Sequence, residues 1–105
     1  MSVEDKIMTE KKAMELQIRL GQYTTEYLSL EREKEAYYRE HINDMSRTTI
    51  KTLYLQQAYI DTVIKKICKL VGRLHLADVD FDNEVATLVY NYYEPSIRRG
   101  LSDLI

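Results

Sequence analysis

Residues 50–74 read IKTLYLQQAYIDTVIKKICKLVGRL, and this stretch decides the fold. Apolar residues recur in it at alternating spacings of three and four, with Gln57 as a polar interruption: Ile50, Leu53, Ile60, Ile64, Ile67, Val71 and Leu74. This spacing puts the side chains on one stripe of an α-helix, and such a stripe must be buried against another helix. The stretch therefore predicts the core helix of an all-α protein, with bounds of about 47–75.

The segment before this helix carries a matching stripe. The same spacing runs from Ala13 through Leu16, Leu20, Tyr23, Tyr27, Leu30, Lys34 and Tyr37. It predicts a first helix over about 3–42, capped by Ser2 and continuous through Gly21. A polar cluster, Asn43 to Ser46, predicts a turn with Asp44 or Ser46 as the next N-cap. We expect a long, coiled-coil-like antiparallel hairpin; because no Gly or Pro marks the turn, one very long helix is the alternative.

The C-terminal segment loses the periodicity after His75. Asp82 or Asn83 can cap a third helix over about 83–94, with Val85, Leu88, Val89 and Tyr92 facing inward. Proline is favoured in the first turn of a helix and disfavoured inside one, so Pro95 predicts a short fourth helix over about 95–104. We expect these two short helices to close the open end of the hairpin, in a single domain spanning 1–105.

A second apolar stripe lies on the other side of the first helix. It consists of Ile7, Met14, Ile18 and Leu28, and one partner helix cannot cover both stripes. Either a third helix of the same chain or a second copy packs there. Nine tyrosines, with Tyr90, Tyr92 and Tyr93 crowded near helix ends, suit half-buried or interface positions. Because a thin hairpin buries little, we expect a homodimer, with Ile7, Met14, Ile18, Leu28, Tyr90, Tyr92 and Tyr93 as candidate interface residues.

Gln57 admits two interpretations. A single polar residue on an apolar seam often fixes the register or the partner of a helix, which would favour oligomerisation. Alternatively, Gln57 meets Lys34, the polar interruption of the other stripe.

Charge is unevenly distributed along the chain. The net charge is −2, but segments 1–45, 46–75 and 76–105 carry −3, +5 and −4. The basic residues of the core helix lie opposite its apolar stripe, which suggests a nucleic-acid-binding face made by Lys51, Lys65, Lys66, Lys69 and Arg73. The alternatives are that these cations are simply solvated or that acidic segments of the protein or its oligomer neutralise them.

Catalytic and metal-binding patterns find little support. His41, His75 and Cys68 have none of the spacings typical of ligand sets or nucleophilic sites. Asp78, Asp80 and Asp82 resemble the first half of a calcium loop, but Val89 stands where a bidentate Glu is required. We predict no enzyme, no metal and no cofactor.

The remaining composition indicates location and function class. No apolar run is long enough to span a membrane, the N-terminal residues lack a signal-peptide pattern, and the single Cys68 suits a reducing compartment. We expect a cytoplasmic protein that does not bind membranes. The leading hypothesis is a non-enzymatic helical interaction module, such as an adaptor, small chaperone or regulator, that binds itself and a protein partner. The second hypothesis is a nucleic-acid-binding regulator that uses the basic face.

Overall fold

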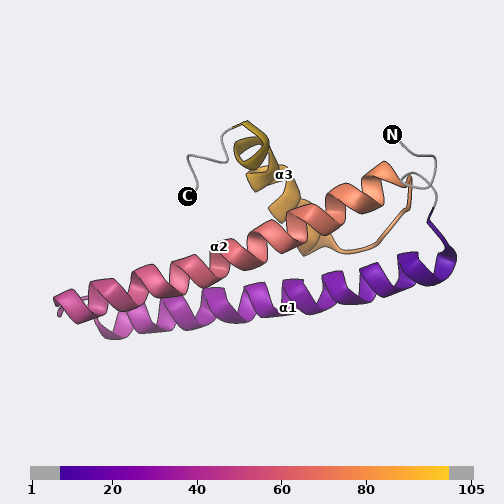
Figure 1. Cartoon of the computed structure of the whole chain (residues 1–105). Helices are drawn as coiled ribbons and strands as arrows, with labels where there is room; N and C mark the ends of the chain where they lie inside the picture. The colour runs from indigo at the N-terminus through magenta and orange to yellow at the C-terminus, as the bar shows by residue number, and fades with distance from the viewer. Residues whose placement is uncertain (1–7, 100–105) are drawn as a thin grey trace.

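The computed structural model of this protein describes residues 8–99 and consists of three helices joined by short connections. Helices α1 (Glu10–Glu40) and α2 (Arg47–Leu76) lie side by side and are joined by a turn over residues 41–46, while α3 (Glu84–Arg99) crosses α2 (Figure 1). The described residues contain no strand. The prediction of an all-helical protein is therefore confirmed.

Each helix begins at a polar cap. The Thr9 hydroxyl accepts a bond from the Lys12 N–H at 3.1 Å, so α1 begins at Glu10 and not at about residue 3; the predicted Ser2 cap lies outside the described residues. The Ser46 hydroxyl caps α2 by accepting from the Thr49 N–H, as predicted. These side chains satisfy backbone N–H groups that have no partner within the first turn.

Asn83 both caps α3 and ties it to α1. Its side-chain oxygen accepts from the Ala86 N–H at 3.0 Å, and its side-chain nitrogen donates to the buried Thr24 hydroxyl at 3.2 Å. The Thr24 hydroxyl in turn donates to the Gly21 carbonyl. The start of α3 is thereby fixed against the middle of α1.

The end of α2 is closed by a Schellman motif. The Val79 N–H donates to the Leu74 carbonyl and the Asp78 N–H to the His75 carbonyl, at 2.9 and 3.0 Å. Asp78 has a positive φ of 59°, a left-handed conformation that aspartate tolerates better than most residues. The motif turns the chain sharply toward α3.

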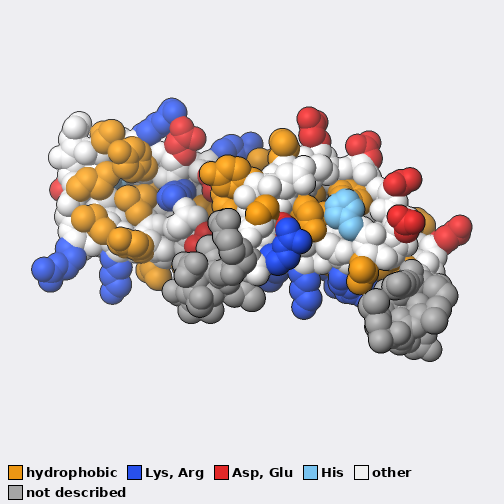
Figure 2. All heavy atoms as spheres, turned by 90° about the horizontal axis from the view of Figure 1, so that it is seen from above, with side chains coloured by type: hydrophobic (Ala, Val, Ile, Leu, Met, Phe, Trp, Pro, Cys, Tyr) orange, Lys and Arg blue, Asp and Glu red, His pale blue; other side chains and the backbone are white. Residues whose placement is uncertain are grey.

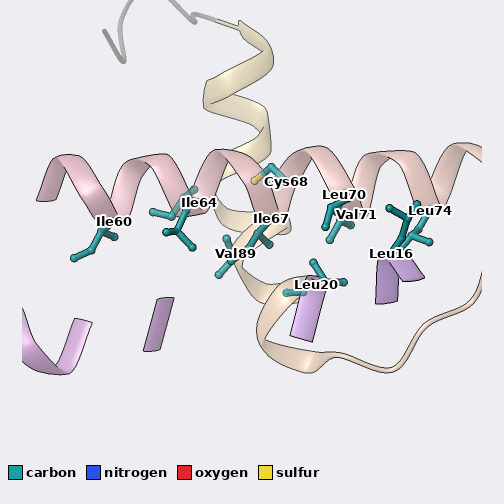
Figure 3. Close-up of a cluster of buried hydrophobic side chains, with 12 residues drawn as sticks. Leu16, Leu20, Ile60, Ile64, Ile67, Cys68, Leu70, Val71, Leu74 and Val89 are labelled. Atoms are coloured by element: carbon teal, nitrogen blue, oxygen red, sulfur yellow. The ribbon is translucent and has the colours of Figure 1, made fainter. Parts of the chain in front are cut away.

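The core is formed where all three helices meet. Leu16 and Leu20 of α1 lie beneath Val71 and Leu74 of α2, and Val89 of α3 reaches toward Ile67 (Figure 3). The most deeply buried large side chains are Leu16, Leu20, Ile60, Ile67, Val71 and Leu74. All six belong to the two stripes predicted from sequence, so those stripes do form the α1–α2 interface.

α3 differs from the prediction in its continuity. One helix from Glu84 to Arg99 runs through Pro95, in place of two short helices meeting there. Proline costs about 3 kcal/mol inside a helix because it lacks an N–H and crowds the preceding turn. Tyr93 and Ile97, one turn apart and on either side of Pro95, both pack against the core, and a continuous helix is what keeps both there. The predicted positions 100–104 lie outside the described residues.

The inward face of α3 also differs from the prediction. Ala86 and Val89 are buried, whereas Leu88 and Tyr92, predicted to face inward, are 63% and 76% exposed. Because residues four apart share a helix face, Leu88 and Tyr92 instead form an outer ridge. α3 packs mainly against α2 and leaves Met14 and Ile18 of the second stripe exposed.

Replacing Leu20 by Ala should lower the free energy of unfolding by about 2–5 kcal/mol, because it leaves a cavity beneath Val71. Leu55→Ala, the same truncation at a position on α2 that is 56% exposed, should change it by less than about 0.5 kcal/mol. Urea denaturation followed by circular dichroism measures both. Equal losses in the two variants would contradict this assignment of the core.

Candidate functional site

A groove lies between α1 and α2 near the turn that joins them. It has a volume of about 590 Å³. We call it the tip groove; its lining residues are Glu31, Lys34, Glu35 and Tyr38 of α1 and Ile50, Leu53, Tyr54 and Gln57 of α2. Ile50 and Tyr38 are each 44% exposed and Tyr54 is 74% exposed. Hydrophobic side chains gather at this end of the hairpin (Figure 2).

A row of polar side chains crosses the seam at the base of the tip groove. The Lys34 ammonium donates to the Gln57 side-chain oxygen, and the Gln57 side-chain nitrogen donates to Asp61 at 2.9 Å. The interpretation that Gln57 meets Lys34 within one chain is therefore confirmed. Because this pair replaces apolar contacts, the hairpin holds its register here by hydrogen bonds.

Two neighbouring charges modify the α1 wall of the groove. Glu35 forms an ion pair at 2.5 Å with Arg39, one turn further along α1. Glu31 lies half-buried, and its charge contributes to raising the pKa of the Tyr27 hydroxyl. Burial of the Tyr27 hydroxyl is the largest cause, followed by the charge of Glu31 and by Tyr93. Together these three causes raise the pKa of Tyr27 to about 12. The Tyr27 hydroxyl therefore stays protonated near neutral pH.

The same side of the hairpin holds α3 next to the tip groove. A cavity of about 450 Å³ lies between α1 and α3, where Tyr27 and Leu28 face Val85, Val89 and Tyr93. On the other side of α3, Tyr93, Ser96 and Ile97 face Asp61, Ile64 and Lys65 of α2. α3 thus covers the open half of the hairpin and leaves the tip groove uncovered.

The candidate interface residues from the sequence do not form one surface. Met14 and Ile18 stand exposed on α1, and Leu28 is also exposed but borders the cavity beside α3. Tyr93 is half-buried, and its ring packs edge-on against the exposed Tyr92. Tyr90 is likewise half-buried and lies against the His75 ring. Ile7 lies outside the described residues.

The basic residues of α2 fall into two groups. Lys65, Lys66, Lys69 and Arg73 are exposed, and the first and last of them are eight residues, or about 12 Å of helix, apart. Lys51 stands fourteen residues, or about 21 Å, from Lys65. The Lys66 ammonium lies 5.5 Å from the centre of the Tyr23 ring. In the described part of the chain the ion pairs are Arg39–Glu35 and Arg98–Glu94, so these basic residues have no carboxylate partner there.

The remaining reactive side chains are held in structural contacts. His41 stacks on Tyr37 and its ring nitrogen contacts the Tyr37 carbonyl at 2.8 Å, while His75 packs against Phe81 and Tyr90. Burial, and secondarily Glu94, raises the pKa of the Cys68 thiol to about 11, so the thiolate is scarce near neutral pH. No group of three or more metal-ligating side chains comes together within the described residues, including Asp78, Asp80 and Asp82.

Sequence reasoning did not identify the tip groove as a site. The spacing assigns Ile50 to the buried seam, and neither Tyr38 nor Tyr54 is predicted to line a protein-binding groove. A signal was present, because both polar interruptions of the seam, Lys34 and Gln57, lie in the half of the hairpin nearest the turn. An apolar seam that becomes polar on both helices marks the point where tight packing gives way to an open surface.

Comparisons with protein-family models, curated proteins and solved structures give no match to this chain. Over residues 8–99, none of the helices combines the length and apolarity needed to cross a membrane.

Stability should decrease between about pH 9 and pH 11. The ordinary pKa of the thiol is 9.0, so the unfolded chain releases the Cys68 proton near pH 9, whereas the folded chain retains it until about pH 11. The unfolded state therefore binds fewer protons in this interval, and unfolding becomes easier as the pH rises. Urea midpoints measured from pH 7 to 11 should fall less steeply for Cys68→Ala than for the natural sequence. Parallel curves would show that Cys68 does not contribute.

Proposed function

We propose that this protein is a non-enzymatic helical interaction module, such as an adaptor, small chaperone or regulator, whose tip groove receives a segment of a protein partner. The supporting observation is the uncovered groove itself, in which Ile50, Tyr54 and Tyr38 expose apolar surface. Contiguous exposed apolar surface rimmed by polar groups is typical of interaction sites. Tyrosine suits such a surface, because its ring is buried on binding while its hydroxyl keeps a polar partner.

The non-enzymatic part of the proposal follows from the chemistry of the reactive groups. A Cys68 thiol with a raised pKa is a poor nucleophile, and both histidine rings pack against other aromatic rings. A cytoplasmic location belongs to the same proposal, since the one cysteine in the sequence cannot form a disulfide within the chain.

Self-association through a different surface is the second part of the proposal. Met14 and Ile18 are 63% and 61% exposed, and Leu88 and Tyr92 form an outer ridge on α3. Burial of such side chains stabilises an interface in proportion to the apolar area removed from water. A homodimer with a larger, coiled-coil-like bundle would provide that burial and leave the tip groove available.

Nucleic-acid binding is the second candidate function. The observation that favours it is the exposed group Lys65, Lys66, Lys69 and Arg73, which has no carboxylate partner in the described region. Phosphates could neutralise these cations. The net charge of −2 and the apolar tip groove favour the protein-binding candidate.

Charged substitutions in the tip groove should abolish partner capture. The test uses tagged protein that carries Ile50→Glu and Tyr54→Glu, added to an extract of cells that make the protein. This variant should capture less than about a tenth of the partner that the natural sequence captures, because docking would bury two carboxylates. The measurement is quantitative mass spectrometry of the captured proteins.

The matched control carries Leu55→Glu and Tyr59→Glu, which change one aliphatic and one aromatic residue on the same helix, exposed but outside the groove. It should retain the partner. Undiminished capture by the groove variant would refute the proposed site, and loss of capture after nuclease treatment would favour the nucleic-acid candidate.

The natural sequence should sediment as a dimer at micromolar concentrations, and Met14→Glu with Ile18→Glu should shift it to monomer. The variant places two carboxylates on the exposed α1 stripe, where they would be desolvated in a dimer. Sedimentation equilibrium gives both masses, and the Leu55→Glu, Tyr59→Glu variant should remain dimeric. A monomeric natural sequence at tens of micromolar would contradict self-association.

A further inference from the structure

The tip groove is the continuation of the surface on which α3 lies. On α1, Lys34 lies seven residues nearer the turn than Tyr27, which faces α3. On α2, Gln57 lies seven residues nearer the turn than Ile64, and Tyr54 lies seven residues nearer than Asp61. Seven residues make almost two full turns of an α-helix, so each pair lies on nearly the same side. The hairpin therefore presents two successive binding positions for a helix on one face, which we call seats. α3 occupies one of them.

The filled seat indicates what shape fits the empty one. α3 is a helix that buries Ala86 and Val89 against the hairpin and packs Tyr93 beside Tyr27. The tip groove extends from Glu31 to Tyr38 on α1 and from Ile50 to Gln57 on α2, about 10 Å on each, which matches two turns of a helix. A helix laid in an apolar groove is also a common mode of peptide recognition.

α3 of the same chain does not serve as this occupant. Asn83 binds its first turn to Thr24 of α1, and Ala86 and Val89 are already buried in the core. An occupant of the tip groove must be a different helix.

The charges around the tip groove favour an acidic helix. The half-buried Lys34 ammonium has three hydrogens to donate, and its described partner is Gln57, with no carboxylate within 4.0 Å among the residues that the structure describes. Arg47 and Lys51 are exposed and lie three residues from Ile50 and Tyr54, so they neighbour the α2 wall. On the α1 wall the opposing charges are Glu31 and Glu35, and Arg39 is paired with Glu35.

We propose that the tip groove binds an acidic amphipathic helix of a partner protein, placed as α3 is placed on its own seat but with a carboxylate opposite Lys34. This inference rests on the proposed function and names the chemistry of its partner. The two seats differ at their centres. In the α3 seat the hairpin presents Tyr27, which faces Tyr93 of α3, and in the tip groove it presents Lys34 at the position equivalent to Tyr27. That difference lets the hairpin distinguish its own helix from the partner's.

Two fluorescein-labelled peptides test the proposal on the full-length protein. Both carry the sequence of residues 83–99 with Pro95→Ala to favour a helix; one has Tyr93→Glu and the other Tyr93→Lys, at the position expected to face Lys34. Fluorescence anisotropy at low salt should show at least tenfold tighter binding of the Glu peptide, the size expected for one charge-assisted hydrogen bond. Added salt should reduce this preference.

Variants of the protein locate the site of binding. Lys34→Glu should reverse the preference, and Lys34→Met should remove it, which keeps the test valid if the charge reversal disturbs folding. Tyr54→Ala should weaken binding of the Glu peptide about tenfold, whereas the matched Tyr59→Ala, exposed on the same helix outside the groove, should leave it unchanged. Circular dichroism verifies that each variant is folded.

Equal binding of the two peptides, preference for the Lys peptide, no binding, or equal effects of Tyr54→Ala and Tyr59→Ala would each overturn the proposal. So would dimerisation that is lost in Tyr54→Ala, which would assign the groove to a second copy. Tighter peptide binding after Leu101→Ser and Leu104→Ser would assign it to the chain's own C-terminal residues. If the peptides fail while groove substitutions still abolish partner capture, the interaction function stands and only the acidic chemistry of the partner is refuted.

Discussion

The rest of the structure depends on the burial of one α2 stripe by two different helices. Two helices alone share only a thin seam, because each seam residue keeps one side open to water. In the open half of the hairpin, Ala86 and Val89 of α3 close that side, and Ile67, Val71 and Leu74 become fully or almost fully buried. Ala86 is completely buried there. The bond from Asn83 to Thr24 then fixes where along the hairpin this burial occurs.

In the half of the hairpin nearest the turn, the seam between α1 and α2 is satisfied without a third helix. Where α3 gives no cover, the seam contains Lys34 and Gln57, which can be satisfied by each other and by Asp61 without a third helix. An apolar pair at these positions would leave a larger hydrophobic surface uncovered in the free protein. The polar pair therefore makes an open tip tolerable, and it leaves donor capacity on Lys34 for a ligand.

The sequence was informative where the structure is determined by local pattern and less so where it is determined by packing. Spacing along the chain identified the stripes of α1 and α2, and side-chain chemistry identified Ser46 and Asn83 as caps. The break predicted at Pro95 was wrong because the rule for proline is local, whereas the continuity of α3 depends on contacts of Tyr93 and Ile97 with distant residues. The face of α3 was misassigned for a similar reason: the local sequence offers Leu88 and Tyr92 as well as Ala86 and Val89, and packing against α2 decides which pair is buried.

The tip groove could not be located from sequence because it is defined by the length of hairpin that α3 leaves uncovered. In the structure α1 and α2 have nearly equal lengths, 31 and 30 residues, while α3 has 16 and crosses α2 instead of following it. A helix that crosses covers a short part of the seam, whatever its own length. The crossing thus leaves one seat uncovered. Heptad spacing alone would assign buried or boundary positions to three of the residues that line it, Tyr38, Ile50 and Tyr54. Their exposure in the folded chain, beside a lysine with unused donors, is what gives this end of the hairpin a recognisable binding chemistry.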